Sequence, residues 1–327
     1  MSKENTLGGK KAGNGAIEAL KDQLGLIIGL VLLCVLLSIM SPVFFSGKNF
    51  FNVLRQLSNN MFLSCGMLMV ILIGGIDLSV GSTIAVTGCL CAGMMTKMGF
   101  PPALAIFLTL CIGLLIGIIN GLLISKTNIP AFIITLAMMN IGRGIARLYT
   151  NSKTITINNK FFGFIGTGYI GPMPMQVLYI VVVCVVTGLL LNKTKFGREL
   201  YATGGNANAA KFAGINTQKV TFLVFVYSSL MASIAGIVLA SRMYSGTPTA
   251  GDGAEMDAIA AVVLGGTSMS GGVGNIFGTI IGVILIAVLS NGMNLLGIDS
   301  SWQLVVKGIV IIIAVYIDFV KKSKGKD

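Results

Sequence analysis

The sequence predicts an all-α integral membrane protein with about ten transmembrane helices and with glycine-rich elbows where helices are broken. Hydrophobic residues make up 54% of the 327 residues and charged residues only 10%, whereas a soluble domain carries about 25% charged residues. The apolar residues also form long uncharged blocks, such as residues 24–40 and 177–191, and roughly 20 mostly apolar residues suffice to cross a bilayer as a helix. Many of the 43 glycines lie inside such blocks, where small residues allow membrane helices to pack closely.

The individual spans follow from the lengths of the apolar blocks and from the loops between them. In chain order, we expect spans at residues 24–41, 56–75, 80–97, 103–125, 130–149, 176–192, 219–241, 256–273, 275–296 and 302–320. The membrane domain then covers residues 24–320, between an N-terminal tail of residues 1–23 and a C-terminal tail of residues 321–327.

The distribution of charge predicts the orientation of these spans. With the N-terminus inside, more than half of the 23 Lys and Arg residues fall in cytoplasmic tails and loops, as the positive-inside rule requires. Both termini are then cytoplasmic. The same assignment places the acidic residues of segment 252–257 outside, where Asp252 and Glu255, together with Lys153 and Lys160, would offer charge complementarity to a docked protein.

Several kinds of chemistry are excluded by what the sequence lacks. It contains no histidine, so triads and zinc sites built on imidazole are excluded. Its six cysteines all lie in apolar stretches without a C-x-x-C pair, which favours small buried side chains over a metal site. No phosphate-binding G-x-x-x-x-G-K-[ST] loop occurs. We therefore expect no catalytic residue, metal or cofactor on this chain, and any ATPase must be another polypeptide.

Two glycine-rich segments interrupt the apolar blocks and are candidates for broken helices. The first elbow reads GGIDLSVGS at residues 74–82, and the second elbow reads LGGTSMSGGVG at residues 264–274. Glycine permits tight turns, and paired broken helices flank the path in many transporters. The similarity between the two segments is short, so it supports an internal repeat only weakly.

Polar groups at membrane depth need partners or a water-filled cavity, which makes them candidates for a translocation path. Asp77 is the chief acid at that depth, and its carboxylate has two alternative roles, capping a broken helix or contacting a substrate. On the same ground, the candidate path residues are Asp77, Ser79, Ser82, Asn120, Asn140, Thr267, Ser268, Asn291 and Asn294.

The loop of residues 193–219 is the largest predicted cytoplasmic feature and is rich in cations. Asn206 is a suitable cap for a short helix that begins at Ala207, and Gly214 is a suitable stop for it. Phe212 and Ile215 would give this helix a small apolar face. The loop is either an ordinary basic loop or a docking element at the membrane surface.

Three segments resemble the hallmark motifs of the sugar permeases of bacterial ABC importers, the family for ribose, xylose, arabinose and galactosides. They are GGIDLSVGS at 74–82, TKFGRELYATGGNANAAKFAGI at 194–215 and EMDAIAAVVLGGTSMSGGVGNIFGTIIGVIL at 255–285. Their order and spacing also match, over about residues 24–320. Further segments, including SPVFFSGKNFFNVL at 41–54 and NGMNLLG at 291–297, resemble the ribose-specific branch.

The resemblance implies a multi-pass protein of the bacterial cytoplasmic membrane that forms the path for a monosaccharide, ribose in the first place. It implies three partners: a second permease subunit, expected as a homodimer, a cytoplasmic ATPase that holds ATP and Mg²⁺, and an extracytoplasmic sugar-binding protein. It also implies that the large cytoplasmic loop docks on the ATPase, although the longer EAA consensus of another importer class is missing. The coupling residues implied are Gly197, Arg198, Gly204, Gly205, Asn206, Ala209, Ala210, Ala213, Gly214 and Ile215.

An ion-coupled secondary sugar transporter is the alternative to an ATP-driven permease. Such transporters usually carry several ionisable groups at membrane depth, and this sequence offers chiefly Asp77 there. The hypothesis of an ATP-driven permease is therefore preferred.

Overall fold

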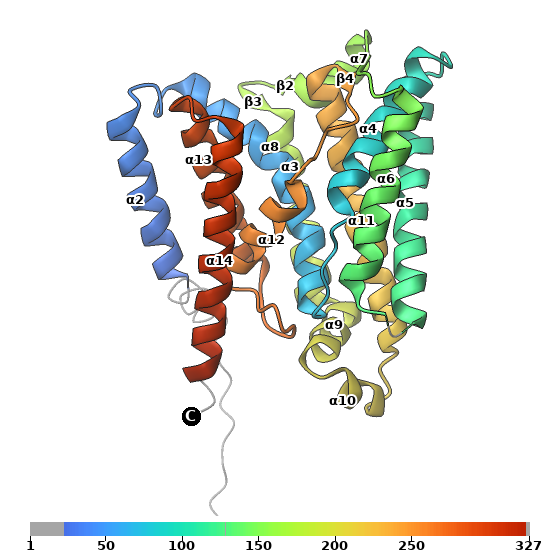
Figure 1. Ribbon diagram of the computed structural model, residues 1–327, viewed down its shortest axis with the longest axis vertical. Coiled ribbons are helices and arrows are strands. Elements are labelled where there is room, and N and C mark those ends of the chain that lie inside the picture. Colours follow the sequence, from blue (N-terminus) through green and yellow to red (C-terminus); the bar gives the residue numbers. More distant parts are fainter. Residues whose placement is uncertain (1–22, 128, 325–327) are drawn as a thin grey trace, which may run out of the picture.

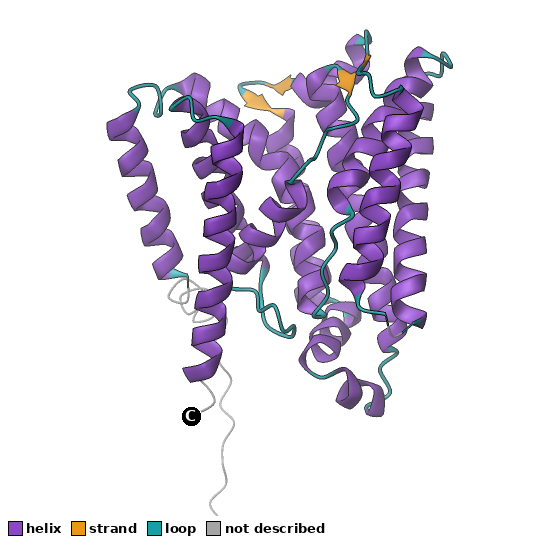
Figure 2. Ribbon diagram, viewed as in Figure 1, coloured by secondary structure: helices purple, strands orange, loops and turns teal. Residues whose placement is uncertain are grey.

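The computed structural model describes residues 23–127 and 129–324 (Figure 1). The predicted N-terminal tail, apart from Gln23, and the last three residues of the predicted C-terminal tail lie outside these ranges. Within them the chain forms 13 helices and four two-residue strands (Figure 2). The predicted helical class is confirmed in this coarse form.

The long helices form a bundle, and α7 marks one end of it and α9 the other (Figure 1). Five of them, α5, α6, α8, α11 and α13, are long and apolar enough to cross a membrane, and α2, α4 and the first part of α14 are shorter apolar helices. The helices of the bundle are α2 (Leu24–Met40), α3 (Gly47–Leu72), α4 (Val80–Thr96), α5 (Pro102–Lys126), α6 (Ala131–Thr150), α8 (Met175–Lys193), α11 (Thr217–Met243), α12 (Ala254–Leu264), α13 (Ile276–Leu295) and α14 (Ser300–Lys324).

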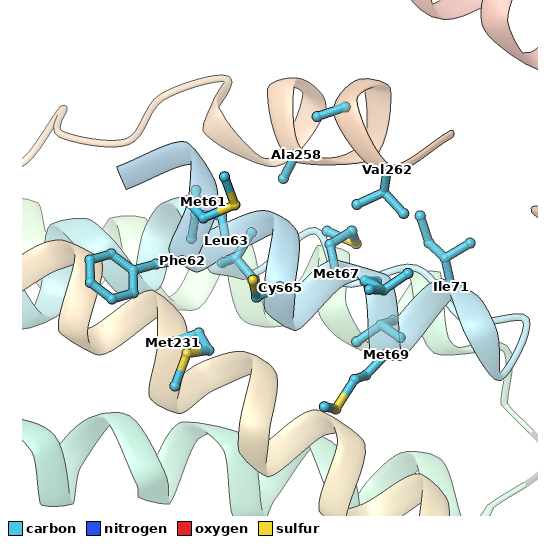
Figure 3. Close-up of a cluster of buried hydrophobic side chains, with 14 of the residues drawn as sticks. Met61, Phe62, Leu63, Cys65, Met67, Met69, Ile71, Met231, Ala258 and Val262 are labelled. Carbon is cyan, nitrogen blue, oxygen red and sulfur yellow. The ribbon is translucent and has the colours of Figure 1, made fainter. Parts of the chain in front are cut away.

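Helix α3 is the centre of the hydrophobic core. Every residue from Met61 to Leu72 is buried, which means that this half of the helix is covered on all sides. Figure 3 shows side chains of α3 between α11, which contributes Met231, and α12, which contributes Ala258 and Val262. A helix buried all round is apolar all round, so periodicity alone could not identify its neighbours.

Two crossings of the bundle are only half helical. Residues 73–79 leave the end of α3 without helical structure and run toward the middle of the bundle, where α4 begins (Figure 1). Residues 247–253 come from the opposite end in the same manner and lead into α12. Helices α4 and α12 begin beside each other. The backbones before and at their first turns are so close that a methyl group on Gly251 would lie 2.7 Å from the carbonyl oxygen of Gly81.

Helix α6 braces both non-helical segments. Thr135 Oγ1 donates a hydrogen bond to the carbonyl oxygen of Ile76 at 3.1 Å. Arg143 Nη1 donates to the carbonyl oxygens of Pro248 and Ala250 at 3.0 and 2.8 Å. These bonds satisfy backbone groups that have no helical partner, which is a requirement for irregular backbone inside a membrane protein.

The α7 end is covered by a short helix and two small hairpins. Helix α7 (Lys160–Thr167) packs against the end of α11, and β1 (Ile155–Thr156) pairs antiparallel with β4 (Ser245–Gly246). The strands β2 (Tyr169–Ile170) and β3 (Met173–Pro174) form the second pair. At the other end, α9 (Lys195–Gly205) and α10 (Ala207–Phe212) follow α8.

The predicted spans differ from the helices by more than four residues in two places. Helix α3 begins nine residues before the span predicted at 56–75, because Ser46 caps it and its polar first turns continue beyond the apolar block. The span predicted at 256–273 is wrong as a helix: α12 ends at Leu264, since Gly266, Gly271 and Gly272 all adopt positive φ and form a turn.

Candidate functional site

Helices α9 and α10 are built by local capping. Thr194 Oγ1 accepts a hydrogen bond from the Gly197 amide at 3.1 Å at the start of α9. Asn206 Oδ1 accepts from the Ala209 amide at 2.9 Å at the start of α10, so the predicted cap is confirmed. Gly214 follows α10 with a φ of 81°, which is the left-handed conformation expected of a helix stop.

The aromatic side chains of α9 and α10 differ in exposure, because Phe196 and Tyr201 pack against the hydrophobic core and Phe212 does not. Phe212 is 93% exposed, whereas Ile215 packs against the hydrophobic core. The predicted apolar face shared by these two residues is therefore wrong, because the turn at Gly214 directs Ile215 inward. The exposed members of the predicted coupling set are Arg198, Gly205, Asn206, Ala209, Ala213 and Gly214, and the buried ones are Gly197 and Ala210.

A junction of glycines, which we name the glycine junction, joins α9 to both elbows. It consists of Gly74, Gly204, Gly205, Gly271 and Gly272. The Gly272 amide donates a hydrogen bond to the carbonyl oxygen of the last residue of α3 at 2.8 Å.

The approach of the backbones in the glycine junction leaves no room for a side chain at Gly204, Gly271 or Gly272. A methyl group on Gly271 would lie 2.8 Å from the Gly204 carbonyl oxygen and 3.0 Å from the Gly74 amide nitrogen. A methyl group on Gly272 would lie 2.7 Å from the Gly205 Cα atom. Distances under 3.0 Å are shorter than van der Waals contact allows. Glycine at these positions therefore lets α9, the end of α3 and the second elbow meet here.

Asp77 is fully buried and is the centre of a hydrogen-bond network. Its Oδ1 atom accepts from the Ser79 amide at 3.0 Å and from Ser79 Oγ at 2.6 Å. Its Oδ2 atom accepts from Ser228 Oγ of α11 at 2.8 Å. Asn120 Nδ2 of α5 donates to Ser79 Oγ at 3.0 Å. The network ties the first elbow to two long helices.

The other candidate path residues do not join this network, apart from Ser82, whose hydroxyl donates to the Ser79 carbonyl oxygen. Asn291 forms a reciprocal pair of amide hydrogen bonds with Asn49 of α3, at 2.9 and 3.0 Å. Thr267 and Ser268 are buried in the second elbow.

Two further candidates are exposed. Asn140 donates to the Leu136 carbonyl oxygen of its own helix. Asn294 lies at the α7 end, where its Oδ1 atom accepts from Gln303 Nε2 at 2.9 Å. The nine residues thus do not form one cluster, and their part in a path stays a prediction.

Several charged groups inside the bundle were missed or misplaced by the sequence reasoning. Arg143, whose side chain is mostly buried, forms a 3.3 Å ion pair with Asp252, whose side chain is exposed. Lys307 of α14 forms a 2.7 Å ion pair with Asp257 of α12. Glu255 is only 7% exposed, and its Oε2 atom finds no hydrogen-bond partner among the described residues. Glu255 therefore does not lie on a docking surface, and Asp77 is not alone at depth. The sequence did contain one indication of charged groups at depth, because Arg143 is a cation inside an apolar block.

Apolar membrane helices, two half-helical crossings and a buried polar network define a polytopic membrane protein of the transporter type. Residues 49–315 match the family model described as the permease component of the branched-chain amino acid transport system. The chain belongs to this family of permease components.

Curated relatives extend over nearly the whole chain. The ribose import permease protein RbsC of Bacillus subtilis (strain 168) is 46% identical over 308 residues, which cover 94% of this chain and 95% of that protein. The ribose import permease protein RbsC of Escherichia coli (strain K12) is 42% identical, over 89% of this chain and 92% of that protein. The xylose transport system permease protein XylH of Haemophilus influenzae is 34% identical, over 86% of this chain and 91% of that protein. No solved structure matches the chain.

Proposed function

We propose that this chain is the transmembrane permease subunit of an ATP-binding cassette importer and forms the translocation path for ribose in the bacterial cytoplasmic membrane. The observation that carries the proposal is the 46% identity to a ribose import permease over 94% of the chain. The five membrane-length helices and the half-helical crossings support the same function.

The proposed topology has ten crossings, with α9, α10 and both termini in the cytoplasm and α7 outside. Counting each half-helical crossing as one span accounts for α4 and α12, whose 17 and 11 residues are short for a bilayer. Lys193, Lys195, Arg198, Lys211 and Lys219 all lie at the α9 end, where the positive-inside rule favours cations. The membrane domain is then residues 24–320 between cytoplasmic tails.

Coupling to the ATPase takes place through α9 and α10. The exposed Phe212 and the exposed backbone around Asn206 and Gly214 form the docking surface, residues 197–215 being the coupling segment. A displacement of α9 must move the end of α3 and the second elbow as well, because the glycine junction holds the three backbones in contact. The energy of ATP binding would reach the two half-helical crossings by this route.

The assembly contains two copies of this permease, a cytoplasmic ATPase that carries ATP and Mg²⁺, and an extracytoplasmic sugar-binding protein. This chain contributes the gated path and no hydrolysis. The path runs beside the polar groups of the elbows, with Asp77, Ser79, Ser82 and Asn120 near its middle. A neutral sugar needs hydrogen bonds rather than a charged pocket, and hydroxyl and amide groups supply them.

Uptake of labelled ribose by cells from which the gene has been deleted tests the proposal. We expect uptake to be lost, to return when the gene is re-expressed, and to resist competition by unlabelled xylose, galactose and fructose. Normal entry of every sugar in the deletion strain, with no redundant system present, would refute the permease function. Loss of another pentose or hexose with ribose uptake intact would refute ribose alone.

A further inference from the structure

A polar cavity of about 460 Å³ opens at the α7 end of the bundle. Four helices contribute to it: α3, α7, α11 and α13. All its lining side chains are polar, and they are Asn52, Arg55, Gln56, Thr167, Arg242 and Asn294. Its volume lies within the range of about 300–1,000 Å³ that is usual for small-molecule sites.

Contacts with neighbouring residues hold the two arginine side chains of the cavity in place. Arg242 Nη1 donates a hydrogen bond to the Arg55 carbonyl oxygen at 3.2 Å. Arg55 in turn bonds the Tyr169 hydroxyl through Nη2 and lies 5.2 Å from the centre of that ring. These contacts occupy one nitrogen of each guanidinium and leave further donors on both side chains, which line the cavity.

The amides of the cavity are also oriented. Gln303 Nε2 donates to Asn294 Oδ1 at 2.9 Å, which leaves the Asn294 NH₂ group as a donor for a ligand. Arg55 Nε is buried without a partner among the described residues, so a polar ligand that reaches it would remove an unsatisfied donor. Asn52 and Gln56 each offer both a donor and an acceptor.

The chemistry of these groups fits a compound with several adjacent hydroxyls. Hydroxyls donate and accept, so they match a mixture of three amides, one threonine hydroxyl and two guanidinium forks. No carboxylate lines the cavity within the described residues, so a cationic ligand does not fit. The apolar groove between α5, α8 and α11, which has no polar lining side chain apart from the hydroxyl of Tyr179, offers no comparable set of partners.

We propose that this cavity is a monosaccharide-binding site of the permease itself, where the sugar is held at the outer end of the path before it passes the elbows. The proposal rests on the proposed function and adds to it the place and the residues of sugar recognition. Asn294 joins the cavity to α14 through Gln303, so a bound sugar would contact α3, α11 and α13 directly and α14 through this hydrogen bond.

The test is direct binding of ribose to the permease–ATPase complex in lipid nanodiscs without the sugar-binding protein. Saturation-transfer NMR with millimolar ribose serves as the readout, and inorganic phosphate is the competing probe for an anion site. We expect Gln56→Ala and Asn294→Ala to weaken ribose binding at least tenfold. Asn158→Ala is the matched control, because Asn158 is an exposed amide at the same end outside the cavity.

Three other results would contradict the proposed sugar-binding site. Displacement of ribose by phosphate would make it an anion site, and unchanged ribose binding in both variants, or none in the wild-type complex, would remove the sugar from it. Loss of docking of the sugar-loaded binding protein, with ribose binding unchanged, would make it a protein contact. Melting temperatures within a few degrees of wild type exclude misfolding, and ribose uptake by wild-type vesicles tests the proposed function separately.

Discussion

At the scale of single residues, buried polar groups in this protein secure backbone that has no helical partner. A buried carboxylate is costly unless it is fully hydrogen-bonded, and Asp77 receives three hydrogen bonds. Two of them come from Ser79 in the same elbow, and one comes from Ser228 on α11. The side chain therefore anchors the first elbow to α11, which favours the structural role.

Substitution at Asp77 separates the two roles. Asp77→Ala removes the acceptor of three buried donors, the Ser79 amide and the Ser79 and Ser228 hydroxyls. We expect this to cost at least about 3 kcal/mol of stability, at about 1–3 kcal/mol for each unsatisfied group. Asp77→Asn keeps one acceptor oxygen and the shape of the side chain, so we expect the protein to remain folded while ribose uptake falls. Thermal unfolding of the purified protein and uptake are the measurements. Unfolding of Asp77→Asn would assign a purely structural role to the residue.

The sequence predicted only the local half of this network. The spacing of Asp77 and Ser79 indicated a capping interaction, because such bonds form within a few residues. Ser228 is 151 positions away and Asn120 is 41 positions from Ser79. Such contacts depend on which helices pack together, and a nearly uniform apolar sequence does not encode that choice as a pattern.

At the scale of elements, the glycine junction links any movement of α9 to the end of α3 and to the second elbow. Gly204 and Gly205 are adjacent in α9 but differ in their surroundings. A methyl group on Gly204 would collide with the Leu72 carbonyl oxygen and the Gly272 amide, whereas a methyl group on Gly205 would meet nothing within 4 Å. The pair provides a matched test of the junction.

We expect Gly204→Ala to uncouple ATP hydrolysis from ribose transport and to cost about 1–3 kcal/mol, the usual range for overpacking. Gly205→Ala should behave as wild type, with a stability change within about 1 kcal/mol. ATPase activity and ribose uptake are measured together in proteoliposomes that contain the complete importer. Equal coupling in the two variants would show that the junction does not transmit the motion.

Helix α10 presents one aromatic anchor to the proposed ATPase surface. Aromatic residues, phenylalanine among them, are enriched at protein interfaces, and Phe212 is 93% exposed. We expect Phe212→Ala to weaken binding of the ATPase at least tenfold, since hot-spot truncations cost about 2 kcal/mol or more. Phe161→Ala is the control, because Phe161 is 65% exposed on α7 at the opposite end. Copurification of the ATPase with each variant is the measurement, and equal yields would contradict the docking assignment.

Most elements were predictable from the sequence, and the exceptions have a physical cause. Helices α5, α6, α8, α11 and α13 lie within two residues of the predicted spans, because long apolar blocks bounded by polar loops determine them. Helix α9 was missed, since its polar composition resembles that of a loop. Its helical form depends on the Thr194 cap and on the packing of Phe196, Leu200 and Tyr201 in or against the hydrophobic core. The early end of α12 was missed because glycine is also common inside membrane helices.

At the scale of the whole molecule, the two half-helical crossings run in opposite directions and meet in the middle of the bundle (Figure 1). Helix α6 holds both, through Thr135 on one and Arg143 on the other. The glycine junction lies at the α9 end and the polar cavity at the α7 end. The short echo between the two glycine-rich motifs did not reveal this arrangement, because the second motif forms the turn after α12 and not the non-helical half of its crossing.

The proposed orientation of the whole bundle predicts opposite accessibility of its two ends. A single cysteine replaces Asn158 at the α7 end or Asn208 on α10, both exposed positions, in a background from which the six native cysteines have been removed. An impermeant maleimide should label Asn158→Cys in intact cells and should label Asn208→Cys only after the membrane is permeabilised. The physical reason is the concentration of cations at the α9 end, which disfavours its translocation. Labelling of Asn208→Cys in intact cells would invert the topology and remove α10 from the reach of a cytoplasmic ATPase.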